Sequence, residues 1–94
     1  MGVTKHDKIA KIISRKKGAE YNPGKGVDIK TRTQKIEVEV DQGKFKDGVR
    51  QLQGYRGARY LAVPNELVEE AVEYTKDLKV GVMNEKGEII KRAG

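Results

Sequence analysis

Residues 27–40 have the sequence VDIKTRTQKIEVEV, and this stretch decides the fold that we expect for the chain. In its second half, apolar residues alternate with Glu37 and Glu39, which is the period of a β-strand with one apolar and one polar face. Residues 27–31 and 35–40 are therefore predicted to be two strands joined by a short turn. They form a hairpin in which both glutamates lie on the same face.

The segments around this hairpin alternate between helix and strand. Thr4 and Gly18 are suited to begin and end a helix, and Asn65 is suited to cap a later one. A strand, a crossover helix and a second strand imply a right-handed parallel connection. The predicted class is α/β, with a mixed central sheet flanked by helices in the order α-β-β-α-β-α-β-β. We expect helices at residues 5–17, at residues 44–55 and after Asn65, and further strands at residues 60–63, 80–83 and 88–91.

The length and composition of the chain indicate which kinds of protein it can be. A chain of 94 residues is the size of one domain, here residues 1–94. It contains no cysteine, which excludes disulfides and thiolate metal sites and suits a reducing compartment such as the cytoplasm. No stretch approaches the ~20 apolar residues of a membrane span, so no membrane partner is expected. The lack of cysteine together with abundant lysine and glutamate is also typical of thermophile proteins.

The net charge of +6 is unevenly distributed along the chain. Residues 1–60 contain 15 lysines and arginines against seven acidic residues, whereas residues 61–94 contain five against seven. The basic part is also the part that holds the carboxylate hairpin. Because lysine and arginine gain affinity by displacing counterions from phosphates, this asymmetry favours a nucleic-acid partner. An ordinary solvated basic surface is the alternative.

Three carboxylates can meet on the predicted hairpin. Asp28 lies on its first strand, and Glu37 and Glu39 lie on its second. Carboxylate oxygens at this density suit a hard cation such as Mg²⁺ or Mn²⁺, which can activate water and neutralise charge on a phosphodiester. A solvated polar strand face is the alternative explanation of the same pattern.

Three short motifs then resemble, in order, those of a known family. They are GKGVD at residues 24–28, IEVE at residues 36–39 and QLQGY at residues 51–55. They are similar to the motifs GhxxD, (D/E)xK and QxxxY of the RecB-type branch of the PD-(D/E)xK nuclease superfamily, which also includes small Holliday-junction resolvases of archaeal type. The resemblance runs from the first helix through Val63. It implies a restriction endonuclease-like core and Mg²⁺- or Mn²⁺-dependent hydrolysis of nucleic acid, DNA in the first place.

The resemblance also implies roles for individual residues. Asp28, Glu37 and the carbonyl of Val38 would be metal ligands. Gln51 and Tyr55, which share one side of their helix, would line the site or touch the nucleic acid. The basic residues expected to hold the nucleic-acid backbone are Lys25, Lys44, Lys46, Arg50 and Arg56. Superfamily nucleases often form homodimers, so a homodimer is a further expectation.

One departure from the family pattern leaves the activity open. Glu39 stands where the family has its lysine, although some restriction endonucleases of the superfamily work with ExE. Lys30, two residues after Asp28, could supply the missing cation on the same sheet face. The alternative is an inactive nuclease-fold module that binds nucleic acid or a protein partner. His6, the only histidine, is expected to be exposed on a lysine-rich helix.

Overall fold

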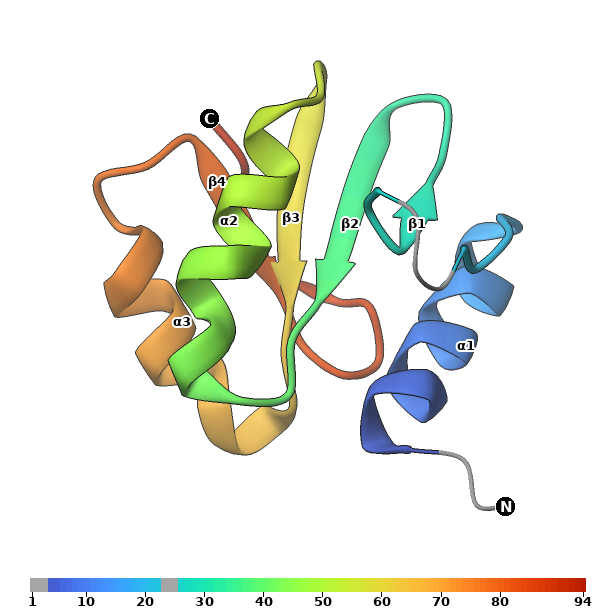
Figure 1. Cartoon of the computed structure of the whole chain (residues 1–94), viewed down its shortest axis with the longest axis horizontal. Coiled ribbons are helices and arrows are strands. Elements are labelled where there is room, and N and C mark those ends of the chain that lie inside the picture. The colour runs from blue at the N-terminus through green and yellow to red at the C-terminus, as the bar shows by residue number, and fades with distance from the viewer. Residues whose placement is uncertain (1–3, 23–25) are drawn as a thin grey trace.

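The computed structural model describes residues 4–22 and 26–94 (Figure 1). Over these residues the chain folds into helices and short strands that follow the expected order closely. The 3-10 turns η1 and η2 lead into the second and third helices. The elements are α1 (Lys5–Lys17), β1 (Ile29–Lys30), β2 (Gln34–Val38), η1 (Gln42–Lys44), α2 (Phe45–Gln53), β3 (Ala58–Ala62), η2 (Asn65–Leu67), α3 (Val68–Thr75), β4 (Val80–Met83) and β5 (Ile89–Lys91).

Within the described residues the strands form one five-stranded sheet in the order β1-β2-β3-β4-β5. The three central strands are parallel, because α2 connects β2 to β3 and α3 connects β3 to β4. The edge strands β1 and β5 are antiparallel to their neighbours. The prediction of an α/β fold with a mixed central sheet is therefore confirmed.

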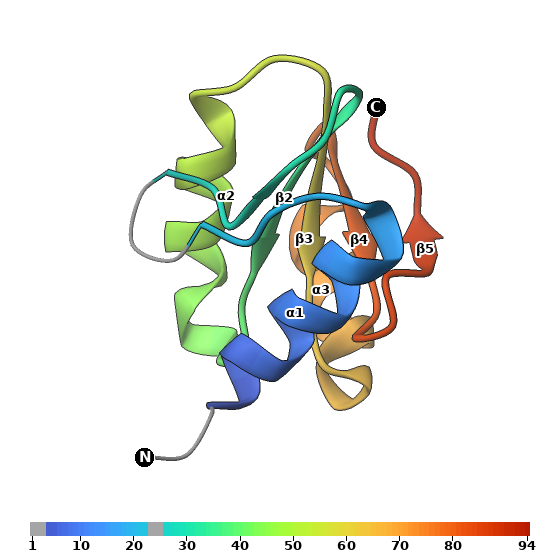
Figure 2. The same ribbon diagram turned by 90° about the vertical axis from the view of Figure 1, so that its right-hand side faces the viewer.

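The helices cover both faces of the sheet. Figure 2 shows α1 in front of the sheet, on the face opposite to α3. The core accordingly has two parts, and burying each large apolar side chain contributes roughly 1.5–3 kcal/mol. Between α1 and the sheet the buried residues include Ile9, Ala10, Ile13, Ile36, Val38, Tyr60 and Met83. Between the sheet and the helices α2 and α3 they include Val27, Phe45, Val49, Leu52, Leu61, Val63, Ala71 and Val82.

The ends of α1 follow the sequence signals. The Thr4 side chain accepts a hydrogen bond from the Asp7 backbone N–H, and Gly18 adopts a left-handed conformation with φ 65°. The N–H groups of Gly18 and Ala19 return to the carbonyls of Arg15 and Ser14. The bounds predicted for this helix, residues 5–17, are confirmed.

Strand β1 is shorter than predicted, because a side chain replaces part of its ladder. The Asp28 carboxylate Oδ2 accepts a hydrogen bond from the Val38 N–H at 2.9 Å, a position that a backbone carbonyl would take in a continued strand. Regular pairing therefore begins only at Ile29, opposite Ile36. Asp28 is thereby held at the junction of a loop and a strand.

The prediction that Asn65 caps the third helix is wrong. Pro64 precedes η2 and Leu67 precedes α3, and neither position provides a side-chain cap. Asn65 is instead the first residue of η2, and its backbone N–H donates to the Glu85 carboxylate at 2.9 Å. An N-cap side chain accepts the N–H of a residue two or three positions later, and here the Leu67 N–H donates to the Pro64 carbonyl.

Lys91 ties the last strand to the end of α3. Its ammonium donates to the carbonyls of Thr75, Leu78 and Val80 at 2.9, 3.3 and 2.7 Å. A cation near the carboxyl end of a helix is favourable because it meets the negative end of the helix dipole. In the part of the chain that the structure describes, no helix is long and apolar enough to cross a membrane.

Candidate active site

Asp28 and Glu37 interlock across the β1–β2 hairpin. The Asp28 backbone N–H donates to Glu37 Oε1 at 3.1 Å, while Asp28 Oδ2 accepts from the Val38 N–H at 2.9 Å. Asp28 is only 5% exposed. The two carboxylates named from the sequence are therefore neighbours, and each is held by the other strand.

The backbone of Val38 faces the same place. In a strand the N–H and C=O of one residue point to the same side, so the Val38 carbonyl lies on the side where its N–H meets Asp28. The following residue, Glu39, points its N–H the other way, to the Ala62 carbonyl of β3. The Val38 carbonyl is thus directed toward the Asp28 side of β2, as a further oxygen donor would have to be.

His6 contacts the Asp28 carboxylate, contrary to the expectation that it is exposed. Its Nε2 lies 3.0 Å from Asp28 Oδ2, and its side chain is 29% exposed. The loop before β1 holds the ring from the other side, because the Tyr21 hydroxyl lies 3.1 Å from His6 Nδ1. The long separation in sequence between residues 6 and 28 explains why no local pattern revealed this contact.

The ring of His6 is held between two side chains. The Tyr21 hydroxyl donates to Asp7 Oδ1 at 2.6 Å and lies 3.1 Å from His6 Nδ1, while His6 Nε2 lies 3.0 Å from Asp28 Oδ2. The contacts of Tyr21 and Asp28 on opposite ring nitrogens fix the orientation of the imidazole beside the Asp28 carboxylate.

The carboxylates of the hairpin are crowded and partly desolvated. Burial, together with the charge of Asp28, raises the pKa of Glu37 to about 8. Burial also raises the pKa of Glu39 to about 7, with Asp28 adding to the effect and His6 opposing it. The pKa of Asp28 is raised by burial, although the Val38 N–H and His6 favour its charged form. A cation bound among these oxygens would relieve the crowding.

Helix α2 packs directly on Glu39 through a glycine. A Cβ added at Gly48 would lie 2.8 Å from Glu39 Cγ and 2.9 Å from Leu61 Cδ1. Only a residue without a side chain permits this approach of helix and strand. Gln51 follows Gly48 by three residues and so lies near the same side of α2, whereas Tyr55 lies two residues beyond the end of the helix.

Tyr55 reaches the loop that carries Asp28, whereas Gln51 is exposed. The Tyr55 hydroxyl accepts a hydrogen bond from the Val27 N–H at 3.3 Å. The Lys30 ammonium lies over the Tyr55 ring, 5.0 Å from its centroid. Tyr55 therefore positions the segment before Asp28, and Lys30 stacks on that tyrosine.

The basic residues expected to hold the nucleic-acid backbone lie in different parts of the structure. Lys44 is close enough to Glu39 that its charge partly opposes the rise that burial causes in the pKa of that carboxyl. Lys46 and Arg50 line a depression of about 230 Å³ together with Tyr74, on the side of α2 toward α3. Arg56 is exposed beyond the end of α2, and Lys25 lies outside the described residues.

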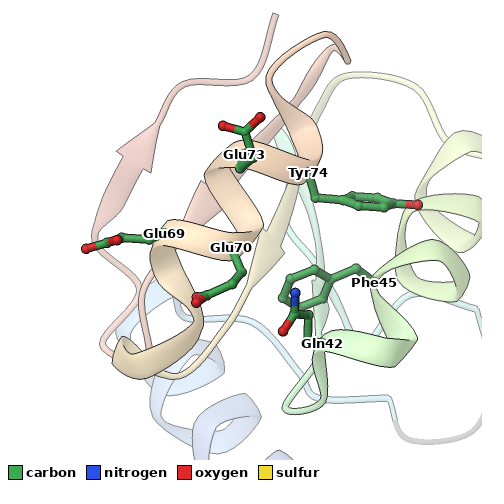
Figure 3. A pocket seen from close by; sticks show the side chains of 6 residues that line it. All are labelled: Gln42, Phe45, Glu69, Glu70, Glu73 and Tyr74. Carbon is green, nitrogen blue, oxygen red and sulfur yellow. The ribbon is translucent and has the colours of Figure 1, made fainter.

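A second pocket is unsuited to nucleic acid. It has a volume of about 480 Å³ and lies between η1, the start of α2 and α3 (Figure 3). Its wall includes the carboxylates of Glu69, Glu70 and Glu73, which repel phosphates. The aromatic rings of Phe45 and Tyr74 also line it, and they meet edge to face with their centroids 5.9 Å apart. The hairpin carboxylates contribute no side chain to it.

The donor chemistry of the hairpin fits a hard divalent cation. Asp28, Glu37, Glu39 and the Val38 carbonyl offer oxygen only, which is the ligand type preferred by Mg²⁺ and Mn²⁺. With the side chains as they lie, no group of three or more His, Asp or Glu among residues 4–22 and 26–94 is arranged so that it could hold a metal ion. Comparison of the chain with protein-family models, curated proteins and solved structures gave no significant match.

Proposed function

We propose that this chain is a metal-dependent endonuclease domain with a restriction endonuclease-like core. It hydrolyses the phosphodiester bonds of nucleic acid, and DNA is the substrate to test first. The observation that carries the proposal is the interlocked pair Asp28 and Glu37 at the mouth of the hairpin, with Asp28 almost fully buried. Burying carboxylates that face one another costs stability, and such arrangements are commonly retained for function.

Asp28, Glu37 and the Val38 carbonyl would hold the metal ion. When bound, a divalent ion of this kind lowers the pKa of water and neutralises charge on the reacting phosphate. His6 orients the Asp28 carboxylate, and Tyr21 fixes the ring of His6. Together these contacts keep an oxygen of Asp28 beside the Val38 backbone, where the metal ion would be held.

Glu39 would orient the attacking water in place of the family lysine. It follows the end of β2, two residues after Glu37, and its side chain packs closely against α2 at Gly48. Gln51 lies farther along the same side of α2, where an exposed amide can donate to a phosphate oxygen. Lys30 lies over Tyr55, so its charge lies beside this region rather than at Asp28.

The order of the elements agrees with the proposed core. An antiparallel hairpin, β1–β2, is followed by α2 and a parallel strand β3. Asp28 lies just before β1, Glu37 lies on β2 and Gln51 lies on α2, whereas Tyr55 lies two residues beyond the end of α2. Agreement of this kind supports the family assignment, which remains part of the proposal.

The experiment is a cleavage screen on single-stranded, duplex and branched DNA with Mg²⁺, with Mn²⁺ and with EDTA. Wild-type protein is compared with Asp28→Asn and Glu37→Gln, which keep the side-chain shape. Asp77→Asn and Glu70→Gln, at exposed positions, are the matched controls. We expect metal-dependent cleavage by wild type and both controls, reduced at least 100-fold in the two hairpin variants, which is the order of effect when a charge-stabilising group is lost. Equal cleavage by Asp28→Asn would refute the assignment.

Glu39 favours a second candidate function, an inactive module of the same fold. A half-buried carboxylate at the lysine position adds negative charge where a phosphate has to approach. Such a module would bind nucleic acid in a salt-dependent way, with no response to Mg²⁺ or to Glu37→Gln. The absence of cleavage on every substrate, combined with binding in EDTA, would favour it.

A further inference from the structure

A basic pocket lies at the opposite end of the hairpin from the carboxylates. It occupies about 590 Å³ between the carboxyl end of α1 and the β1–β2 turn. Lys17 comes from α1, and Lys30 and Arg32 come from the hairpin. Among the described residues that line it there is no carboxylate, in contrast to the pocket at α3.

The turn that forms one wall of this pocket is held in place by hydrogen bonds before any ligand binds. The Thr31 hydroxyl accepts the N–H groups of Thr33 and Gln34 at 3.3 and 2.9 Å, which closes the turn. The Thr33 carbonyl accepts the Ala58 N–H at 3.3 Å, which joins the turn to the start of β3. A pre-organised wall of this kind loses little conformational freedom on binding.

The carboxyl end of α1 does not oppose an anion strongly. Helix carbonyls at this end are negative, but those of Ser14 and Arg15 are already hydrogen-bonded by Ala19 and Gly18. Lys17 adds a positive charge to the same turn, and Arg32 can offer a planar pair of donors to phosphate oxygens. The ligand that matches these walls is therefore a phosphate group with polar surroundings.

We infer that this pocket binds the phosphodiester backbone of the nucleic-acid strand whose cleavage we propose at the hairpin, a step that rests on the proposed function. Gln34 lines the pocket and Val38, four residues later on β2, holds Asp28. At ~3.3 Å per residue these points lie ~13 Å apart, which equals the rise of about four nucleotides of a duplex strand at ~3.4 Å each. The pocket thus holds a phosphate about four nucleotides from the reacting one.

The test measures binding of a fluorescent single-stranded and a duplex DNA in EDTA, where metal-dependent cleavage cannot occur. The pocket variant is Lys17→Gln with Arg32→Gln. Its control, Lys79→Gln with Arg92→Gln, removes the same charge from exposed positions at the far edge. For single strands each lost phosphate contact reduces the slope of log Kd against log salt by ~0.7, so loss of the one phosphate in the pocket should reduce the slope by about 0.7 in the pocket variant only.

Equal weakening by both double variants, or no binding by wild type at low salt, would overturn the inference. DNA truncated to three or fewer nucleotides on both sides of the cleaved bond should remove the difference between the pocket variant and wild type. Binding is measured without metal, so it does not depend on cleavage. If the Asp28→Asn cleavage assay contradicts the nuclease proposal, the binding assay still shows whether the pocket holds DNA. If cleavage is found, the pocket variant should raise KM and leave kcat unchanged.

Discussion

Replacing Glu37 by glutamine should flatten the dependence of stability on pH. Glu37 has its pKa raised from 4.5 to about 8 by burial and by Asp28, so the folded protein binds this proton more tightly than the unfolded chain. Between these values the folded state holds more protons, and the free energy of unfolding therefore falls as pH rises. The stabilisation is complete below pH 4.5 and is lost as pH passes through about 8.

The size of the effect follows from the shift and from the exposure of Glu37. Each tenfold change in proton affinity corresponds to about 1.4 kcal/mol, which would give an upper bound of roughly 5 kcal/mol. Glu37 is only partly buried, so solvent screening reduces the expected effect to about 2 kcal/mol. Glutamine keeps the Oε1 acceptor for the Asp28 N–H and has no titrating proton.

The assay is urea unfolding in EDTA from pH 5 to pH 9, for wild type, Glu37→Gln and the exposed control Glu70→Gln. We expect the stability of Glu37→Gln relative to wild type to rise by about 2 kcal/mol between pH 6 and pH 9, since ionisation of Glu37 costs stability only in the wild type. Glu70→Gln should parallel the wild type. A Glu37→Gln curve that also runs parallel to the wild type would refute the reasoning.

Four further outcomes follow from the structure. Gly48→Ala should displace Glu39 and cost about 1 kcal/mol, as overpacking exceeds the gain in helix propensity; thermal unfolding measures it. Gly81→Ala should cost roughly 3 kcal/mol or prevent folding, because its Cβ would meet the Lys91 carbonyl at 2.5 Å. Lys91→Met should cost about 2 kcal/mol by releasing three carbonyls, and an unchanged midpoint would contradict this. Mg²⁺ at ten times its Kd should add about 1.4 kcal/mol of stability at pH 8, and this gain should vanish in Glu37→Gln.

Periodicity predicted most of the fold. The alternation in residues 36–40 and the apolar stripes of the helices placed nearly every element, because burial of one face is the dominant local constraint. The prediction was less accurate where a distant side chain intervened. Asp28 shortened β1 by accepting a hydrogen bond from the Val38 N–H, and Asn65 lies inside the 3-10 turn η2 with its own N–H bonded to Glu85, so it does not cap α3.

In the candidate site, too, the contacts between residues far apart in the sequence could not be predicted from local patterns. Asp28 and Glu37 could be brought together from the sequence because a hairpin places them opposite each other. The contact of His6 with Asp28 depends on how α1 crosses the sheet, which no local pattern determines. The basic pocket was missed for the same reason, since Lys17 and Arg32 come from elements that meet only in the folded chain.

The most direct test of the account is Mn²⁺ binding, measured by calorimetry at pH 8 without nucleic acid. The claim is that the oxygens of Asp28, Glu37 and Val38 form a divalent-cation site. Wild type and Asp77→Asn should each bind Mn²⁺, and Asp28→Asn should lose that binding while remaining folded by circular dichroism. Binding of Mn²⁺ by Asp28→Asn as tight as that by wild type, or no binding by wild type, would contradict the claim.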